Sequence, residues 1–353
     1  MDPAHRETDR LLEELEKRLT EEYTAAMHEV QDKMADYLRR FELKDRTWRR
    51  WVKEGRKTEA EYRKWRIGQM AIGERWDEMR RTIAEDMHNV NQIARGMIDE
   101  TRMDAYAINH NWGTYEAEHG AQVDTSYTLY DRDTVARLVR DDPDILPAPG
   151  KATEARIQAG LEERWNRQQI QSVMTQSILQ GESIPQIATR LAEAVGDANR
   201  KAAIRNARTM TTAAENAGRV DAYKRAQGMG IKMRQQWMAT LDGRTRHEHR
   251  LLDGQIVDVG KPFKVEGEEI RYPGDPTAAA YLVYNCRCTV IGAIDGHEQD
   301  LSNIKGRHNA RLGGMSYAEW KKAKDHPEPI LKPDEIAAKM KRAYYPDERK
   351  RKK

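Results

Sequence analysis

Four side chains that could bind a metal ion lie in the last third of the chain, in two pairs of equal spacing. Cys286 and Cys288 are separated by one residue, and so are His247 and His249. Residues i and i+2 of a regular strand point to the same face. The four side chains could therefore assemble a Cys2His2 zinc site.

Two features of the same stretch oppose a zinc site. Tight sites usually place two or more residues between neighbouring ligands, and Arg244, Arg246 and Arg250 add positive charge beside the histidines. The alternative is a β core in which the cysteines are small buried hydrophobic residues and His249 makes a structural hydrogen bond. We therefore expect no cofactor and keep zinc as the alternative.

Catalysis in this stretch would use His249 as a general base, oriented by Asp242 or Asp253. The sequence contains no nucleophile elbow, phosphate-binding loop or metal triad that would complete such a site. We predict that the protein is not an enzyme. The alternative is a DNA-processing or toxin-like enzyme carried by the C-terminal domain.

Composition indicates an elongated or partner-dependent helical protein. Of the 353 residues, 34% are charged and 38% are hydrophobic, and the mean hydropathy is -0.93. The net charge is only +3, so the whole chain is not a nucleic-acid polycation. The start lacks the apolar run of a signal peptide, no stretch is apolar enough to cross a membrane, and the cysteine usage indicates a reducing compartment.

Positive charge is concentrated at the C-terminus. From residue 321 to residue 353 there are twelve Lys and Arg against six Asp and Glu. Such an end could contact nucleic acid through phosphates, or it could be a solvated tail. The candidate DNA-contacting residues are Arg349, Lys350, Arg351, Lys352 and Lys353. A general DNA-binding protein is a further alternative for the whole chain.

The first half of the chain has helical periodicity. Apolar residues from Leu12 to Tyr37 recur at steps of three and four, which predicts a helix over residues 7–40. This helix either packs on the same chain or docks on a partner. A second long helix is predicted over residues 69–110, and the run Asn109–Gly113 is expected to break it.

Residues 41–66 combine aromatic and basic side chains. Trp48, Trp51, Tyr62 and Trp65 lie among Arg and Lys residues. The favoured interpretation is a helical hairpin with buried tryptophans that arginine stems cover. The alternative is a surface that stacks and pairs with nucleic acid.

Beyond residue 150 a helical segment is followed by a small β region. The Pro-rich run that ends at residue 150 predicts a domain or subdomain boundary. Residues 152–228 are expected to form three helices. Strands are expected at 231–240, 255–259 and 281–291, and a hairpin within 264–271.

The order of turns, strands and cysteines resembles the signature of the phage head morphogenesis (minor capsid) proteins, similar to phage Mu protein F and gp7 of phage SPP1. The resemblance covers about residues 155–292, and Met210 stands where glutamate is common in the family. The upstream helix contributes Ala207–Ala213, Asn216–Arg219, Ala222 and Tyr223. The motif itself reads Trp237, Leu241–Arg246, His249–Arg250, Leu252–Gln255, Phe263, Tyr272–Pro276 and Asn285–Cys288.

The resemblance implies a virion component present in few copies. It would lie in the capsid interior near the portal, and in the host cytoplasm during assembly. The implied partners are the portal protein and other head or scaffold proteins, with packaged DNA as a further one and no membrane. Many family members look like zinc binders through a Cys-x-x-Cys where this chain has Arg246 and His249, so we expect this module to fold without metal.

Taken together, we predict an α+β protein, mainly helical, with an elongated N-terminal region and then a compact helical domain with a small antiparallel β-sheet. The predicted regions are a helical docking region at 1–150, a head-morphogenesis (Mu F-like) domain at 151–295 and a basic extension at 296–353. Arg244 and Arg287 could pair with Asp242 or Asp253. The residues expected to hold the β region in shape are Trp237, Asp242, Arg244, Thr245, His249, Asp253, Gly254, Asn285, Cys286, Arg287 and Cys288.

Overall fold

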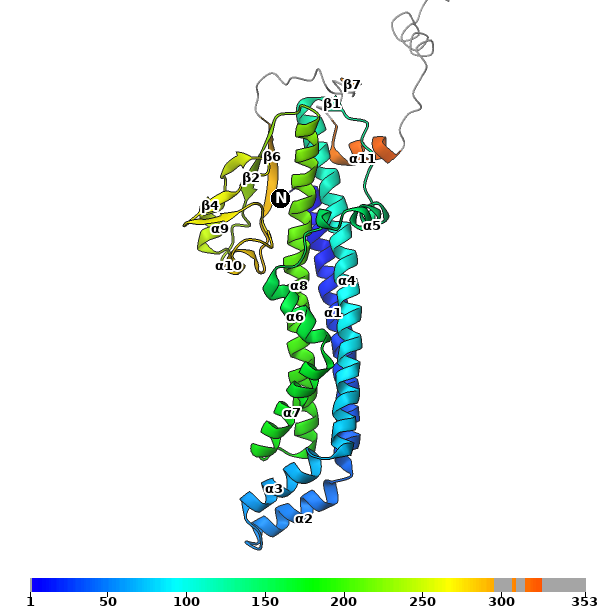
Figure 1. Cartoon of the computed structure of the whole chain (residues 1–353), viewed down its shortest axis with the longest axis vertical. Helices are drawn as coiled ribbons and strands as arrows, with labels where there is room; N and C mark the ends of the chain where they lie inside the picture. Colours follow the sequence, from blue (N-terminus) through cyan, green and yellow to red (C-terminus); the bar gives the residue numbers. More distant parts are fainter. Residues whose placement is uncertain (1, 295–306, 309–314, 326–353) are drawn as a thin grey trace, which may run out of the picture.

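Three long helices that lie side by side form the body of the protein, as the computed structural model shows (Figure 1). They are α1 (Pro3–Arg39), α4 (Glu74–Ala121) and α8 (Ile184–Gly228). At about 1.5 Å per residue they are about 55 to 72 Å long. The described residues are 2–294, 307–308 and 315–325. The predicted class is confirmed: the protein is mainly helical α+β with a small antiparallel sheet.

The predicted stripe on the first helix is confirmed. Leu15, Leu19 and Tyr23 continue a buried row that reaches the end of α1. The helix begins at Pro3, whose fixed φ suits the first helical position. The Asp2 carboxylate accepts the His5 amide N–H at 2.9 Å and so caps the first turn.

One hydrophobic core runs along the three helices as far as Ile98 of α4 and Met210 of α8, and a second core joins the remaining parts of α4 and α8 to the β region. The first core also takes in α7 (Glu163–Leu179), whose apolar side chains pack between α4 and α8. The predicted boundary near residue 150 falls before α6 (Lys151–Leu161). Helices from both sides of residue 150 contribute to the same core, and the division into separate domains stays a prediction.

The predicted break at Asn109–Gly113 is wrong, because α4 continues to Ala121. The Asn109 side chain donates to the Ala105 carbonyl at 2.9 Å and to the Thr8 hydroxyl at 2.7 Å, so its polar group is used inside the fold. Gly113 lies against α8, where an added Cβ would be 2.9 Å from the Ala222 Cβ. These residues serve close packing.

Two further helix boundaries differ from the prediction. The first helix after the linker is divided into α6 and α7. The next two predicted helices are one continuous helix, α8. This helix begins at a capping box formed by Ser183 and Gln186, with Pro185 in the first turn.

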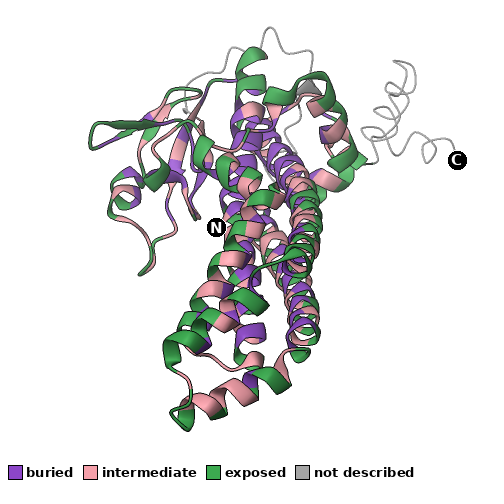
Figure 2. Ribbon diagram, turned by 60° about the horizontal axis from the view of Figure 1, so that its bottom comes forward, coloured by how far each residue is buried: buried purple, intermediate pink, exposed green. Residues whose placement is uncertain are grey.

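The predicted helical hairpin is present at one end of the rod. It consists of α2 (Glu42–Lys53) and α3 (Glu59–Met70) (Figure 1). Its three tryptophans are only half-buried, unlike the favoured expectation. Figure 2 shows that this end of the molecule is largely exposed and intermediate, with few buried positions.

The β region lies beside the opposite part of the rod (Figure 1). A three-stranded antiparallel sheet has the order β3-β2-β6. The predicted hairpin is confirmed as a separate two-stranded unit, β4-β5. The last predicted strand is wrong in its first half, because α10 (Ala280–Val283) precedes β6. The bounds are β2 (Met233–Met238), α9 (His247–Leu252), β3 (Ile256–Asp258), β4 (Phe263–Val265), β5 (Glu268–Ile270) and β6 (Thr289–Ile294).

Smaller elements close the upper end of the rod. The Trp320 indole of α11 donates to the Glu118 carboxylate at 2.7 Å and fixes that helix to α4. In the described part of the chain no helix is long and apolar enough to cross a membrane. The predicted basic end, Arg349 to Lys353, lies outside the described residues. The bounds here are β1 (Val123–Asp124), α5 (Arg132–Asp141), η1 (Pro143–Ile145), β7 (Arg307–His308) and α11 (Tyr317–Asp325).

Candidate functional site

The loop after β2 is built on Asp242. Its carboxylate accepts the Arg244 amide N–H at 2.8 Å, and its own amide N–H donates to the Thr245 hydroxyl at 2.9 Å. Thr245 in turn donates to the Thr240 carbonyl. These local bonds replace strand pairing with a tight turn.

Arg287 joins this turn to the cysteine loop. Its guanidinium makes two hydrogen bonds to the Asp242 carboxylate, at 2.7 and 2.8 Å. The bonds from Arg287, with the Arg244 amide, hold the pKa of Asp242 well below its ordinary value. The Arg244 side chain is 82% exposed, and its Nε lies 3.9 Å from Asp242. Of the two predicted arginine partners, Arg287 is therefore the one that pairs closely.

A second turn holds the start of β3. The Asp253 carboxylate accepts the Ala239 amide N–H at 2.8 Å. The Gly254 amide donates to the Trp237 carbonyl at 2.9 Å, with a φ of 77° that favours glycine. Asp253 therefore does not contact His249 in the way a catalytic pair would require, since its described hydrogen bond goes to the backbone.

His249, Cys286 and Cys288 form a buried cluster. The His249 Nδ1 lies 3.3 Å from the Cys288 sulfur and 3.7 Å from the Cys286 sulfur. The Nε2 lies 2.9 Å from the Leu282 carbonyl, to which it can donate. Trp237, also buried, packs edge-on against the imidazole at 5.8 Å between ring centroids.

The two thiols have different electrostatic surroundings. Burial raises the pKa of the Cys286 thiol. Hydrogen bonds from Cys286 and His249 lower the pKa of the Cys288 thiol below its ordinary value. A backbone N–H, that of Cys288, also points at the Cys286 sulfur at 3.4 Å. The cluster thus favours one thiolate, stabilised by its neighbours.

Three of the four suggested zinc ligands come together, and the fourth does not. His247 is 70% exposed and lies 3.7 Å from Glu266, so the Cys2His2 set is not assembled. The ligand atoms of His249, Cys286 and Cys288 all lie within 4.8 Å of one another. Ligand atoms around a tetrahedral zinc are about 3.5 to 3.8 Å apart, given bonds of about 2.0 to 2.3 Å. The donor set therefore fits three positions of such an ion, with the Leu282 carbonyl orienting the imidazole.

Arg246 lies at the edge of this cluster. Its guanidinium donates to the Tyr284 carbonyl, and its positive charge acts to lower the pKa of Cys286. A cationic side chain therefore already acts on one of the three possible ligands. This arrangement opposes tight binding of a second cation.

The free edge of β6 is covered by side chains of α8, which sequence reasoning did not place in the site. Asn216 accepts the Val290 amide N–H at 2.8 Å and donates to the Cys288 carbonyl at 3.3 Å. Thr212 donates to the Cys286 carbonyl at 2.8 Å. These bonds satisfy backbone groups that an edge strand would otherwise leave unpaired.

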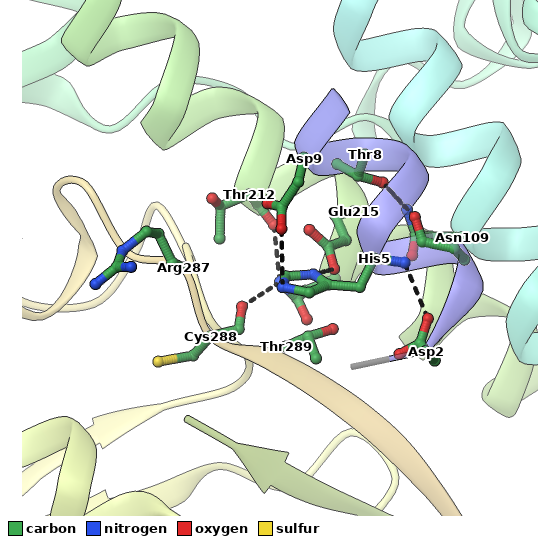
Figure 3. A network of polar contacts seen from close by, with 12 residues as sticks. Asp2, His5, Thr8, Asp9, Asn109, Thr212, Glu215, Arg287, Cys288 and Thr289 are labelled. Carbon is green, nitrogen blue, oxygen red and sulfur yellow. Dashed lines mark hydrogen bonds and ion pairs between the residues drawn. The ribbon is translucent and has the colours of Figure 1, made fainter. Parts of the chain in front are cut away.

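The N-terminus of α1 completes the same network (Figure 3). The fully buried Arg219 donates to the Val290 carbonyl at 3.0 Å and to both Asp2 oxygens at 2.8 and 2.9 Å. Burial raises the pKa of Asp2, but Arg219 outweighs it and lowers that pKa. His5 lies 2.5 Å from Glu215, and both are buried. The first residues of the chain thereby fasten the rod to the β region.

A cavity of about 580 Å³ lies between α1, α8 and the turn residues. Its lining includes the cysteine–histidine cluster and charged side chains of both signs. Across it, Arg208 makes two hydrogen bonds to Glu16, at 2.5 and 2.6 Å. Asn285, with a φ of 51°, is exposed at its rim and donates its amide N–H to Thr209 at 3.4 Å. The polar groups of the site are thus largely bonded to one another.

Comparison with known proteins agrees with the expected region. Residues 168–291 match the family described as Phage Mu protein F like protein. The chain is 25% identical over 325 residues to Minor head protein GP7 of Bacillus phage SPP1, covering 90% of this chain and 94% of that protein. No solved structure matches the chain.

A second relative carries a different name. The chain is 27% identical over 244 residues to NAD(+)--arginine ADP-ribosyltransferase EFV of Enterococcus faecalis. That alignment covers 68% of this chain and 48% of the relative. The chain thus spans about half the length of that protein.

Proposed function

We propose that this chain, which belongs to the phage head morphogenesis family, acts as a minor head protein at or near the portal of a tailed phage. Its work there would be in procapsid assembly, DNA packaging or genome delivery. The observation that carries this proposal is the end-to-end alignment with the SPP1 minor head protein, which covers 94% of that protein. The rod and the β region are matched together, so the relative's role can be proposed for the whole chain.

A structural role is also supported by how the site uses its polar groups. Arg287 is bonded to Asp242, His249 lies within hydrogen-bond distance of the Leu282 carbonyl, and Asn216 covers the edge of β6. Each of these contacts joins two segments of backbone or two turns. We therefore propose that the motif maintains the shape of the β region and its contact with the rod, and that the protein is not an enzyme.

The proposal is tested in a phage that carries this gene. Mass spectrometry of purified procapsids and virions should find the chain in both, in few copies per head. The purified chain should co-elute with the portal protein of the same phage in size-exclusion chromatography. Absence of the chain from heads would refute the proposal. If the chain is present in heads but does not co-elute with the portal protein, only the portal contact is refuted.

The enzyme alternative is separated by His249→Ala. Our proposal predicts a lower melting temperature for this variant, because the buried Leu282 carbonyl loses a donor and a cavity forms. Catalysis by His249 predicts an unchanged melt with loss of an activity. An unchanged melt together with normal head incorporation would contradict the structural role of this residue.

A further inference from the structure

The helical rod has an uneven distribution of charge. Helix α1 has six Lys and Arg against ten Asp and Glu, and α4 has five against ten. Residues 42–70, which form the α2–α3 hairpin, have ten against five. Helix α8 has eight against four, so the three long helices together have a small acidic excess, with nineteen Lys and Arg against twenty-four Asp and Glu, while the hairpin at one end of the rod is basic. A polyanion would be attracted to that end.

Part of the positive charge of the hairpin is not neutralised within the protein. Lys44, Lys53 and Lys64 are exposed, and among the described residues none of them has a hydrogen bond or ion pair. Several arginines of the hairpin are instead neutralised by an acidic neighbour; the Arg63 Nε, for example, lies 3.5 Å from the Glu59 carboxylate. The three lysines are consequently available for phosphate groups.

Half-buried aromatic rings lie among these basic residues. Trp48 stacks on Trp65 at 5.4 Å between ring centroids and contacts Trp51 edge-on at 5.6 Å. The Arg56 guanidinium lies 5.7 Å from the Trp51 ring, and the Lys57 ammonium lies 5.7 Å from the Trp48 ring. Aromatic rings interleaved with cations are the composition with which proteins track nucleic-acid backbones.

The hairpin is held in place by a buried ion pair. Arg66 is fully buried and lies 2.9 Å from Asp45, which also accepts the Tyr62 hydroxyl at 2.8 Å. Arg66 and Arg49 both donate to the Glu182 carbonyl, at 2.9 and 3.0 Å, in the turn between α7 and α8. The basic surface is therefore presented by a fixed element.

We propose that the α2–α3 hairpin binds the phosphate backbone of duplex DNA through Lys44, Lys53 and Lys64, with the tryptophans at the edge of the contact. The choice of duplex DNA rests on the proposed role in a phage head; the basic surface itself does not. Binding by phosphate contacts has no sequence preference and weakens steeply with salt. The hairpin would hold the end of the rod against DNA.

The test is fluorescence anisotropy of a labelled mixed-sequence duplex with the purified full-length chain, over a range of salt concentrations. The Lys44→Gln, Lys53→Gln, Lys64→Gln triple variant should bind at least about tenfold more weakly at low salt. Its slope of log affinity against log salt should be shallower by about 2 to 3, because about 0.9 is lost for each phosphate contact. Its fold should be unchanged, since the lysines have no described partner.

A matched control places the same three substitutions elsewhere. Lys151, Lys261 and Lys322 are likewise exposed and have no side-chain hydrogen bond or ion pair among the described residues, so their change to Gln removes equal unpaired charge. This control should bind DNA nearly as the unchanged chain does. Equal weakening by both triple variants would overturn the proposal, because net charge alone would then explain binding.

Two further outcomes bear on the hairpin. Deletion of residues 345–353 should leave a binding component that the hairpin variant removes; if the deletion abolishes binding, the proposal is overturned. If the hairpin variant keeps its DNA affinity but no longer co-elutes with the portal protein, the surface binds a protein and the proposal is again overturned. These measurements use purified chain, so they are independent of whether the chain enters heads.

Discussion

Alkaline pH is expected to destabilise the fold through His5. This residue is 2% exposed at the start of α1, with its Nδ1 at 2.5 Å from Glu215 and its Nε2 at 3.8 Å from Asp9. Burial alone would lower the pKa of His5, and Arg219 acts in the same direction. The carboxylates of Glu215 and Asp9 outweigh both and raise the pKa to about 9.

The direction of the effect follows from this raised pKa. The unfolded chain has a His5 pKa near 6.5 and the folded chain about 9, so the folded state binds the proton more tightly. The resulting stability is fully present below pH 6.5 and is lost as the pH rises from 6.5 through about 9. At about 1.4 kcal/mol per pH unit, the difference corresponds to about 3 kcal/mol.

Urea unfolding followed by circular dichroism measures this contribution. The free energy of unfolding is compared at about pH 6 and about pH 9.5 for the unchanged chain and for His5→Gln. The unchanged chain should lose about 3 kcal/mol more than the variant does over this interval. His28→Gln, on the exposed face of the same helix, is the control and should behave as the unchanged chain. If the unchanged chain and His5→Gln lose equal stability, the charged His5–Glu215 contact does not hold the two elements together.

Three other changes probe the site. Asn216→Leu should cost about 2 to 4 kcal/mol in urea unfolding, because it leaves the buried Val290 amide of β6 and the Cys288 carbonyl before β6 without their partner; Asn89→Leu, on an exposed part of α4, should change stability by less than about 0.5 kcal/mol. Gly218→Ala in α8 should destabilise the fold by about 1 to 3 kcal/mol or more, because the added Cβ would lie 2.5 Å from the Tyr106 carbonyl oxygen of α4. The control is Gly96→Ala in α4, where an added Cβ meets nothing within 4 Å, and it should stabilise the fold by about 0.5 to 1 kcal/mol. The chain should keep its circular dichroism spectrum and its melting temperature in a chelator, and added Zn²⁺ should leave the melting temperature unchanged, because the positive charge of Arg246 beside the cysteines opposes a second cation; unfolding in the chelator, or a rise in melting temperature with Zn²⁺ that Cys288→Ser abolishes, would contradict this.

The elements that the sequence predicts best are those whose pattern is local. The stripe from Leu12 to Tyr37 depends only on the helical repeat, and it matches the buried face of α1 closely. The Glu-Gly turn between β4 and β5 is also local, with Gly267 at a φ of 86°. In both cases the residues that specify the element lie within a few positions of one another.

The errors occur where polar or small residues serve a distant contact. Asn109 and Gly113 look like a helix break. In the fold, the Asn109 side chain bonds to Thr8 of α1, and the missing side chain of Gly113 allows α8 to approach closely. Gly196 lies where two helices were predicted and α8 is continuous, and an added Cβ there would lie 2.0 Å from Met27 of α1. The local sequence predicts a loop at such positions because it gives no information about the distant helix that packs against them.

The turns of the site were predictable from the sequence, but the side chains at the start of α1 and in α8 that hold the turns in place were not. Asp242 and Arg287 were expected to pair, and they do. Asp2 and Glu215 were not expected, because their partners lie 217 and 210 residues away along the chain. The nearest sequence signal was the Asn216–Arg219 run of the family resemblance, together with the Asp2-Pro3 start of a helix. Neither signal says that the two meet at the edge of β6.

The contacts of the motif indicate where partners can bind. Asn216 and Arg219 bond to both backbone groups of Val290 at the start of β6, and Thr212 bonds to the Cys286 carbonyl before it, so these groups are not available for pairing with another chain. The first turn of α1 closes the same surface through Asp2. The signature of the family is thus used to join the β region to the rod. The basic α2–α3 hairpin lies away from the motif, at the other end of the rod from this junction, so it is free of this role (Figure 1).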